Sequence, residues 1–298
     1  MSAIMIEGGV YINNPKKISR IDMPLISVLI VTYNADDYLE EALKSIFSQT
    51  YENIELIVID GASTDKTVKI LEKYSHKIDY WKSEPDKGQS NAFNKGFSLC
   101  NGRLLTWLNA DEVYTSDAIE KVVKAYRNKP HCSWFSAGIV FADRQLRITK
   151  MRKGEGGTWL LPKIGILNVY GSSTFFTKKI YDEAGGMNED LHFTMDTDLW
   201  WRFIANGERL CRVSHYVCVY RLHEKSKTAN YVVTGTKRKP EHQFEIDRIK
   251  SIYLHKGALN FSAKITRNIF RAFSFSYVIS VIDSVRHRGK YVKEVLRF

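Results

Sequence analysis

The residues best suited to chemistry are the acidic pair Asp111 and Glu112, which follow the apolar segment Leu104–Leu108 after two intervening residues. Hard divalent cations prefer carboxylate oxygens as ligands, so this pair could bind Mg²⁺ or Mn²⁺. Such a cation could hold a diphosphate, because the sequence contains neither a G-x-G-x-x-G cradle after its first predicted strand nor a G-x-x-x-x-G-K-[ST] loop. A second interpretation stays open, in which Asp111 only caps the helix that follows.

Polar residues also end two other predicted strands. Apolar, β-branched runs at Leu25–Thr32 and Ile54–Ile59 predict buried strands, and they end in Thr32-Tyr33-Asn34 and Asp60-Gly61. Segments with helical periodicity separate the strands, at residues 39–47, 68–74 and 89–99. Because ligands bind beyond the carboxyl ends of parallel strands, we expect the three polar clusters to face one crevice.

The alternation of strand and helix predicts an α/β fold, in which a mixed, mostly parallel sheet is flanked by helices. Beyond Pro130, further strands are expected to join the sheet antiparallel, at residues 133–141, 146–151 and 212–220, with helices near 178–183 and 198–205. We predict three parts: a leader or short added strand at 1–23, one large domain at 24–235, and a basic, amphipathic helical region at 236–298.

Composition sets further limits. Hydrophobic residues make up 44% of the chain, which supports a sizeable core and excludes a disordered or fibrous protein. The four cysteines are irregularly spaced and form no C-x-x-C pair, so we expect no disulfide framework, no zinc site and a reducing cytoplasm. Cys211 and Cys218 are expected to be small core residues. The sequence shows neither a secretory signal nor an apolar run long enough to span a membrane.

The net charge of +11 favours an anionic partner, and the surplus is concentrated between residues 264 and 297. This basic region could contact an anionic membrane surface or pack on the main domain, and both interpretations stay open. A nucleic-acid partner is not predicted, because no binding motif and no aromatic stacking platform accompany the charge.

Four short motifs follow one another along the chain. They are Ile30-Val31-Thr32-Tyr33-Asn34, Ile59-Asp60-Gly61-Ala62-Ser63-Thr64-Asp65-Lys66-Thr67, Glu84-Pro85-Asp86-Lys87-Gly88-Gln89-Ser90 and Trp107-Leu108-Asn109-Ala110-Asp111. In order, spacing and predicted strand position they resemble the family 2 glycosyltransferases of the GT-A fold, over about residues 24–225. The resemblance implies transfer of a sugar, with inversion, from a nucleotide diphosphate sugar. The acceptor would be a hydroxyl of a glycan or lipid-linked glycan.

The resemblance also implies a set of donor-site residues. Thr32, Tyr33 and Asn34 would line the base and ribose pocket, and Asp60 would accept a hydrogen bond from the base, for which a uracil N–H is suited. The nucleotide and sugar would be covered by a loop made of Asp86, Lys87, Gly88 and Gln89, and bordered by Asn109 and Ala110. As a turn-forming residue before Gly61, Asp60 has an alternative explanation.

Metal, base and acceptor roles follow from the same resemblance. Asp111 and His223 would hold the divalent cation, and Asp196 would act as the general base. Asp198 is the alternative base, and a capping role for Asp196 also stays open. On the acceptor side the resemblance implies Arg202 and one of two neighbouring indoles, assigned here to Trp200.

The chain departs from the family pattern at two of these positions. Asn109 replaces the first carboxylate of the Asp-x-Asp motif, which leaves metal binding possible but weaker. Met195 stands where an acidic residue often precedes the base, and apolar surroundings raise the pKa of a carboxyl group such as that of Asp196.

Together these features predict a hexosyltransferase of cell-envelope polysaccharide synthesis, such as lipopolysaccharide synthesis, that uses a UDP-sugar in the cytoplasm or at the inner face of the membrane. The alternative is a catalytically weak nucleotide-sugar-binding protein, which the two departures would also suit.

Overall fold

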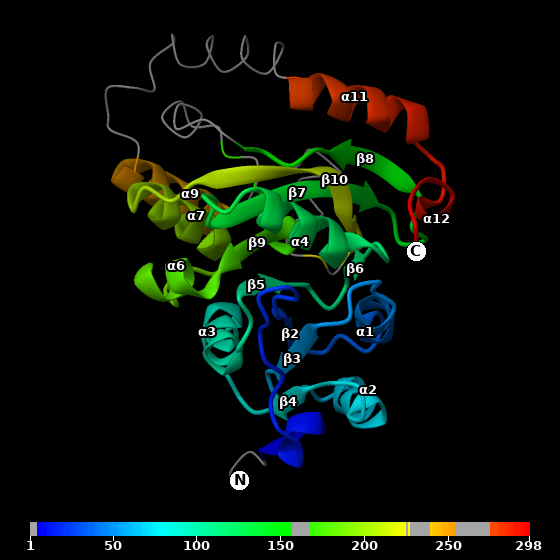
Figure 1. Cartoon of the computed structure of the whole chain (residues 1–298), viewed down its shortest axis with the longest axis vertical. Coiled ribbons are helices and arrows are strands. Elements are labelled where there is room, and N and C mark those ends of the chain that lie inside the picture. Colours follow the sequence, from blue (N-terminus) through cyan, green and yellow to red (C-terminus); the bar gives the residue numbers. More distant parts are fainter. Residues whose placement is uncertain (1–4, 157–166, 168, 225, 227–238, 254–274) are drawn as a thin grey trace.

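The computed structural model describes residues 5–156, 167, 169–224, 226, 239–253 and 275–298. Its strands form one ten-stranded sheet with helices on both faces (Figure 1). The strands are β1 (Ile6–Gly8), β2 (Ile26–Thr32), β3 (Ile54–Asp60), β4 (Tyr80–Ser83), β5 (Leu104–Trp107), β6 (Val113–Tyr114), β7 (Trp134–Ala142), β8 (Ile148–Arg152), β9 (Thr174–Thr177) and β10 (Leu210–Arg221). The helices are η1 (Val10–Ile12), α1 (Leu39–Phe47), α2 (Thr67–Tyr74), α3 (Gln89–Leu99), α4 (Ala118–Asn128), η2 (Gly171–Ser173), α6 (Lys178–Glu183), α7 (Met195–Ala205), α9 (Pro240–Tyr253), α11 (Phe275–His287) and α12 (Val292–Val295).

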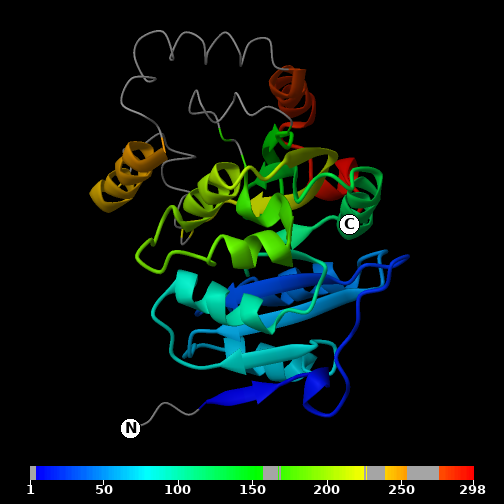
Figure 2. The ribbon, with the colours of Figure 1, turned by 60° about the vertical axis from the view of Figure 1, so that its left-hand side comes forward.

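The sheet has the order β1-β4-β3-β2-β5-β9-β7-β10-β6, and β8 pairs with β7 off this path. In the first half, β4, β3, β2 and β5 pair in parallel. In the second half β9 pairs antiparallel with both β5 and β7, whereas β7 and β10 run parallel. The predicted α/β architecture with a parallel central sheet is therefore confirmed, and the turned view of Figure 2 shows its twist.

The core lies on both faces of the sheet, because every residue of β2, β3 and β7 is buried. On one face the sheet packs against α1, α2 and α4. On the other face it packs against α3, α6 and α7. Figure 1 shows this layering, with α1 and α2 on one side of the first strands and α3 on the other.

Three short strands, β1, β6 and β9, were left open by the sequence or not predicted from it. The segment 1–23 contributes β1, which pairs antiparallel with β4, so it adds a strand to the sheet edge. β6 and β9 were not predicted, since strands of two and four residues carry too little periodicity to be recognised. α7 begins at Met195, three residues before the predicted start, so Asp196 lies in its first turn.

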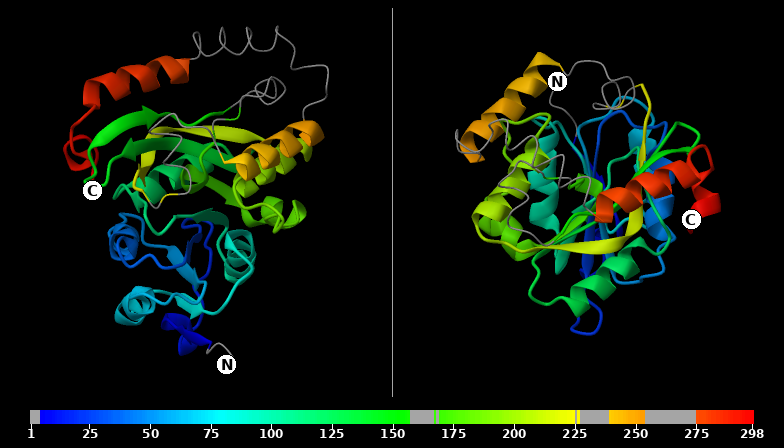
Figure 3. Two further views of the ribbon diagram at one scale, coloured as in Figure 1. Left: turned by 180° about the vertical axis from the view of Figure 1, so that it is seen from behind. Right: turned by 90° about the horizontal axis from the view of Figure 1, so that it is seen from above.

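The C-terminal region packs on the rest of the molecule at two places. α9 reaches the α7 side, where Ile249 is buried in the core and the Tyr253 ring stacks on that of Trp201. α11 lies over β8, as the views from behind and above show (Figure 3). Residues 254–274 of the predicted basic region lie outside the described residues. Among the described helices, none combines the length and apolar character that crossing a bilayer requires.

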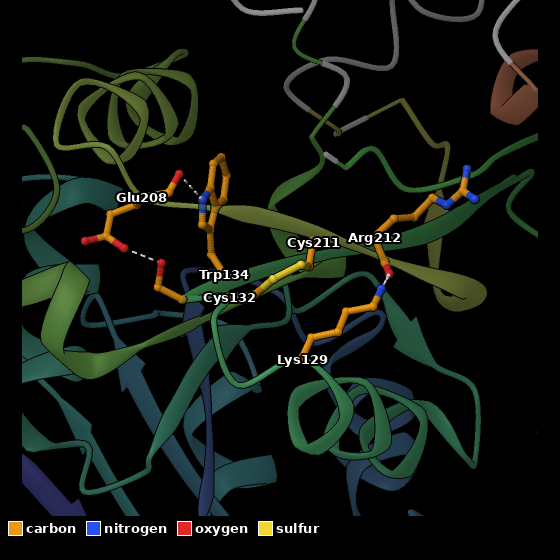
Figure 4. Close-up of a disulfide and its surroundings, with 7 residues drawn as sticks. Lys129, Cys132, Trp134, Glu208, Cys211 and Arg212 are labelled. Carbon is orange, nitrogen blue, oxygen red and sulfur yellow. Dashed lines mark hydrogen bonds between the residues drawn. A yellow bond between two sulfur atoms is a disulfide. The ribbon is translucent and has the colours of Figure 1, made fainter. Parts of the chain in front are cut away.

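The expectation that the cysteines stay unpaired is wrong for Cys132 and Cys211, which form a disulfide (Figure 4). Their Cα atoms lie 6.0 Å apart, although 79 residues separate them in the chain. Cys132 precedes β7 and Cys211 lies on β10, and parallel pairing of these strands brings the two together. Spacing along the sequence carries no sign of such a contact. Cys100 and Cys218 are free and buried. The expected core position of Cys211 and Cys218 is therefore confirmed, since Cys211 is buried as well.

Candidate active site

A cavity of about 1000 Å³ lies at the carboxyl ends of β2, β3 and β5. The three polar clusters predicted to share a crevice all contribute to its lining, so that prediction is confirmed. The predicted site residues that line it are Thr32, Tyr33, Asn34, Asp86, Gly88, Gln89, Asn109, Ala110, Asp111, Asp196 and His223. The structure places Asp60, Lys87, Trp200 and Arg202 elsewhere.

Asp111 and His223 meet on the cavity wall. The Asp111 Oδ2 and His223 Nε2 atoms lie 2.9 Å apart, although 112 residues separate them in sequence. The Tyr38 ring packs against the imidazole, with centroids 4.8 Å apart. A carboxylate and an imidazole nitrogen at this separation suit one divalent cation, because both are common metal ligands. The residues therefore fit the predicted metal.

Asn109 is held by a buried carboxylate. Its Nδ2 donates to Glu112 Oε1 over 2.9 Å and to Ser172 Oγ over 3.3 Å. Burial, together with the nearby charge of Asp111, raises the pKa of Glu112 to about 7. Glu112 thus points inward to hold the Asn109 amide, which orients the amide oxygen of Asn109 as an acceptor.

Asp60 is fully buried, and its carboxylate stabilises the turn that follows β3. Its Oδ2 accepts hydrogen bonds from the Ser63 backbone N–H at 2.9 Å and the Ser83 hydroxyl at 2.6 Å. Its Oδ1 accepts from the Ser63 hydroxyl. Ser63 Oγ in turn accepts from the Asn34 backbone N–H at 2.7 Å. The predicted direct contact with a base is not supported by this geometry, in which Asp60 instead fixes Asn34.

The predicted donor loop closes over the end of β3. Asp86 Oδ1 accepts a 2.7 Å hydrogen bond from the Gly88 backbone N–H, and Gly88 has a φ of 109° that favours glycine. A Cβ atom on Gly61 would lie 2.7 Å from Asp86 Oδ2, so a larger residue at position 61 would displace the Asp86 carboxylate. The Lys87 side chain of this loop is exposed and does not line the cavity.

Asp196 is the carboxylate that faces the cavity from α7. Thr197 donates to its Oδ1 from the backbone N–H at 2.6 Å and from the hydroxyl at 3.2 Å. Burial raises the pKa of Asp196 above its ordinary value, and the Thr197 hydrogen bonds only partly oppose this. The expected upward direction of the Asp196 pKa shift is therefore confirmed.

Asp198, the alternative base, is engaged elsewhere. It is buried, and its Oδ2 pairs with Arg202 at 2.8 Å, while its Oδ1 accepts from the Tyr253 hydroxyl at 3.3 Å. The same contacts explain Arg202, whose guanidinium also donates to the backbone carbonyls of Ala184 and Gly186. Arg202 therefore ties α7 to the end of α6, and the acceptor-side prediction for it is wrong in placement.

Trp200 is also a core residue. Only 1% of its surface is exposed, and its indole stacks between those of Trp107 and Trp134 at centroid distances of 5.6 and 5.5 Å. Trp201 is buried as well, against Tyr253. The prediction that one of the two indoles forms an acceptor platform is wrong, since neither offers an exposed ring face.

Comparison with known proteins decides the family. The glycosyl transferase family 2 model matches residues 27–185, which is more than half of the chain. The chain belongs to glycosyl transferase family 2. An uncharacterised glycosyltransferase of Rickettsia typhi is 29% identical over 233 residues, which cover 74% of this chain and 70% of the relative.

Two solved structures share the fold of this glycosyltransferase. Staphylococcus aureus TarS in complex with UDP-GlcNAc has a TM-score of 0.59 at 16% identity, covering 89% of this chain and 81% of that one. The mannosyltransferase PcManGT of Pyrobaculum calidifontis, in complex with GDP-Man and Mn²⁺, has a TM-score of 0.57 at 19% identity. That match covers 93% of this chain and 84% of the other.

Sequence reasoning missed two supports of the glycosyltransferase site. The first is Arg221, which is 3% exposed and donates from Nε to the backbone oxygen of Asp111 at 3.3 Å. Its guanidinium also pairs with Glu41 and lies 4.7 Å from the centre of the Tyr38 ring. The sequence offered one signal for this contact, an arginine at the end of a predicted buried strand, just before Leu222-His223. A buried arginine needs a carboxylate or carbonyl partner, so such a partner could have been expected near the site.

The second missed support is Glu245 of α9. Its carboxylate accepts hydrogen bonds from the backbone N–H groups of His192, Phe193 and Thr194 at 2.9 to 3.0 Å, and from the Thr194 hydroxyl at 2.9 Å. Burial raises the pKa of Glu245, but these four donors outweigh it, so the pKa is lowered. Glu245 thus fixes the segment that leads directly to Asp196. No sequence signal connects residues this far apart.

Proposed function

We propose that this glycosyltransferase transfers a sugar, with inversion, from a UDP-sugar to a hydroxyl of a glycan or lipid-linked glycan in cell-envelope polysaccharide synthesis. One observation carries the proposal: a carboxylate with a raised pKa, Asp196, lines the same cavity as the Asp111–His223 pair. The complex of TarS with UDP-GlcNAc, in the same fold, supports a UDP-linked donor.

In this proposal Asp196 accepts the proton of the acceptor hydroxyl. The oxygen of that hydroxyl attacks the anomeric carbon from the face opposite the departing diphosphate. Both donors recorded for Asp196 among the described residues reach Oδ1, which leaves Oδ2 to accept the proton. A positioned general base of this kind contributes about 10²–10⁴-fold to the rate. The Asp86–Gln89 loop and Asn109 orient the donor, because positioning lowers the barrier further.

Asp111 and His223 would hold a divalent cation, Mg²⁺ or Mn²⁺, since their ligand atoms lie 2.9 Å apart on the cavity wall. When bound, the cation supplies Lewis-acid stabilisation of the charge on the leaving diphosphate. PcManGT, of the same fold, was solved with Mn²⁺, which supports this assignment.

We place the protein in the cytoplasm, at the inner face of the membrane. A UDP-sugar donor and a lipid-linked acceptor would meet there, and the basic C-terminal region favours an anionic surface.

The test is transfer or donor hydrolysis across a panel of nucleotide sugars, with Mg²⁺, Mn²⁺ or EDTA. We expect one UDP-sugar to be used with a cation and to raise the melting temperature, and we expect Asp196→Asn to lose about 10²-fold or more in kcat while still binding donor. Asp190→Asn is the matched control, because Asp190 is an exposed carboxylate in the same segment. Indifference to every nucleotide sugar would refute the proposal.

A further inference from the structure

The polarity of α11 is the reverse of that expected for a surface helix. Val278, Val281, Ile282 and Val285 follow the spacing i, i+3, i+4 and i+7, so they share one stripe of the helix. These four side chains are 40 to 75% exposed. A helix that only packs on a domain turns such a stripe inward. The stripe of these four residues is called the aliphatic stripe below.

The inward face of α11 is polar and fixed to β8. Ser280 Oγ accepts a 2.9 Å hydrogen bond from the Lys153 backbone N–H. Ser284 Oγ accepts from the Met151 backbone N–H at 2.9 Å and donates to the Met151 carbonyl at 3.1 Å. These bonds use the backbone groups of an edge strand, and they set the rotation of the helix. The aliphatic stripe therefore faces outward because the inner contacts require it.

The exposed charges that follow the aliphatic stripe along the chain are almost entirely positive. Asp283 points inward, where it accepts a 2.6 Å hydrogen bond from the Tyr216 hydroxyl and pairs with Lys153 at 3.5 Å. Glu294 is engaged at the start of α12, where it accepts from the Tyr291 backbone N–H. The exposed cations that follow the stripe are Arg286, Arg288, Lys290, Lys293 and Arg297. An outward apolar stripe beside exposed cations is the pattern of a helix that lies in the surface of an anionic membrane.

The helix that carries the aliphatic stripe packs on a strand that contributes to the cavity wall. β8, on which α11 packs, pairs with β7. Phe141 on β7 and Lys150 on β8 both line the cavity. Figures 1 and 2 place α11 at the end of the molecule opposite the N-terminal strand. A surface that holds α11 would thus hold the second half of the sheet, with its cavity, near the lipid headgroups.

We propose that the aliphatic stripe of α11 docks the protein on an anionic lipid leaflet. A second copy of the chain fits less well, because a stable protein interface uses about 20–30 residues a side and the surrounding cations would repel each other. Membrane docking would bring the enzyme to a lipid-linked acceptor, and in this purpose it rests on the proposed function. The exposed aliphatic stripe itself does not depend on that function.

The test is sedimentation of the full chain with vesicles of phosphatidylglycerol and phosphatidylcholine, and with vesicles of phosphatidylcholine alone. We expect binding to the anionic vesicles and weaker binding in about 0.5 M salt. Ile282→Ser/Val285→Ser should reduce vesicle affinity by about a hundredfold, since each buried aliphatic side chain contributes about tenfold. Ile18→Ser/Ile21→Ser is the matched control, because those isoleucines are 69 and 103% exposed elsewhere in the chain.

Three results would overturn the inference: no sedimentation of the unaltered protein with anionic vesicles, equal binding by Ile282→Ser/Val285→Ser, or a dimer that this variant converts to a monomer. Donor hydrolysis without vesicles is measured on the same samples. If Ile282→Ser/Val285→Ser loses vesicle binding but keeps donor hydrolysis, the defect lies in membrane docking and not in the proposed reaction.

Discussion

Asn109 illustrates how one residue depends on its neighbour. Its amide donates to the buried carboxylate of Glu112, so a carboxylate at position 109 would place two acidic groups about one hydrogen-bond length apart. Asn109→Asp, which recreates the Asp-x-Asp motif, should therefore destabilise the protein by about 1–3 kcal/mol, because a donor is lost and like charges approach. Urea unfolding measures this difference.

The pair can be tested as a double-mutant cycle. Glu112→Gln should restore most of the stability lost in Asn109→Asp, since a glutamine amide can donate to the new carboxylate. Additive effects of the two changes would contradict this account of Asn109.

Asp196 links catalysis and stability through pH. Its pKa is raised in the folded protein by burial, so the contribution to stability is full below the ordinary aspartate pKa and is lost as pH rises through the folded value. Asp196→Asn should therefore raise the melting temperature at pH 8 relative to the unaltered protein, and this gain should vanish near pH 3. The rate should depend on the same ionisation. As the pH is lowered, kcat should therefore fall at a higher pH than it would for a general base with the ordinary aspartate pKa. An equal melting-temperature difference at both pH values would contradict the assignment.

At the scale of helices and strands, the sequence predicted those segments whose own residues show a helical or strand periodicity. The helices at Gln89–Leu99 and Lys178–Glu183 have the predicted bounds. β9 was missed because its pairing with β5 and β7, rather than its four residues, makes it a strand. Trp200 was misplaced for a related reason. An indole on a helix looks the same in sequence whether it meets solvent or, as here, two other indoles of the core.

α9 supports the active site through Glu245, and this contact can be tested. Glu245→Ala removes the acceptor of four hydrogen bonds just before Asp196, so we expect kcat to fall about 10- to 100-fold with a smaller change in the donor KM. Glu245→Gln, which keeps the shape and one acceptor oxygen, should recover part of the loss. Glu241→Ala, an exposed acidic residue at the start of the same helix, is the control. A parallel loss in both alanine variants would point to helix stability instead.

At the scale of the whole molecule, the sequence indicated that polar residues at strand ends would share one cavity, because parallel strands align their carboxyl ends. The family resemblance also indicated that His223 would join Asp111, but nothing in the sequence indicated which C-terminal helix packs beside the cavity. His223 meets Asp111 across 112 residues, and α9 reaches the α7 side from the basic C-terminal region. Such contacts depend on how β10 and the later helices pack, which no local pattern encodes.

The Cys132–Cys211 disulfide joins the segment before β7 to β10, across 79 residues. Because a cross-link of this kind restricts the unfolded chain, Cys132→Ser/Cys211→Ser should lower the free energy of unfolding by about 2–4 kcal/mol. Neither cysteine lines the cavity, so sugar transfer should persist at temperatures where the variant is folded. Reductant should lower the melting temperature of the unaltered protein but not that of the variant. Thiol titration of the denatured, unreduced protein should find only Cys100 and Cys218, and four reactive thiols would show instead that the two cysteines are neighbours without a bond, as a reducing cytoplasm would leave them.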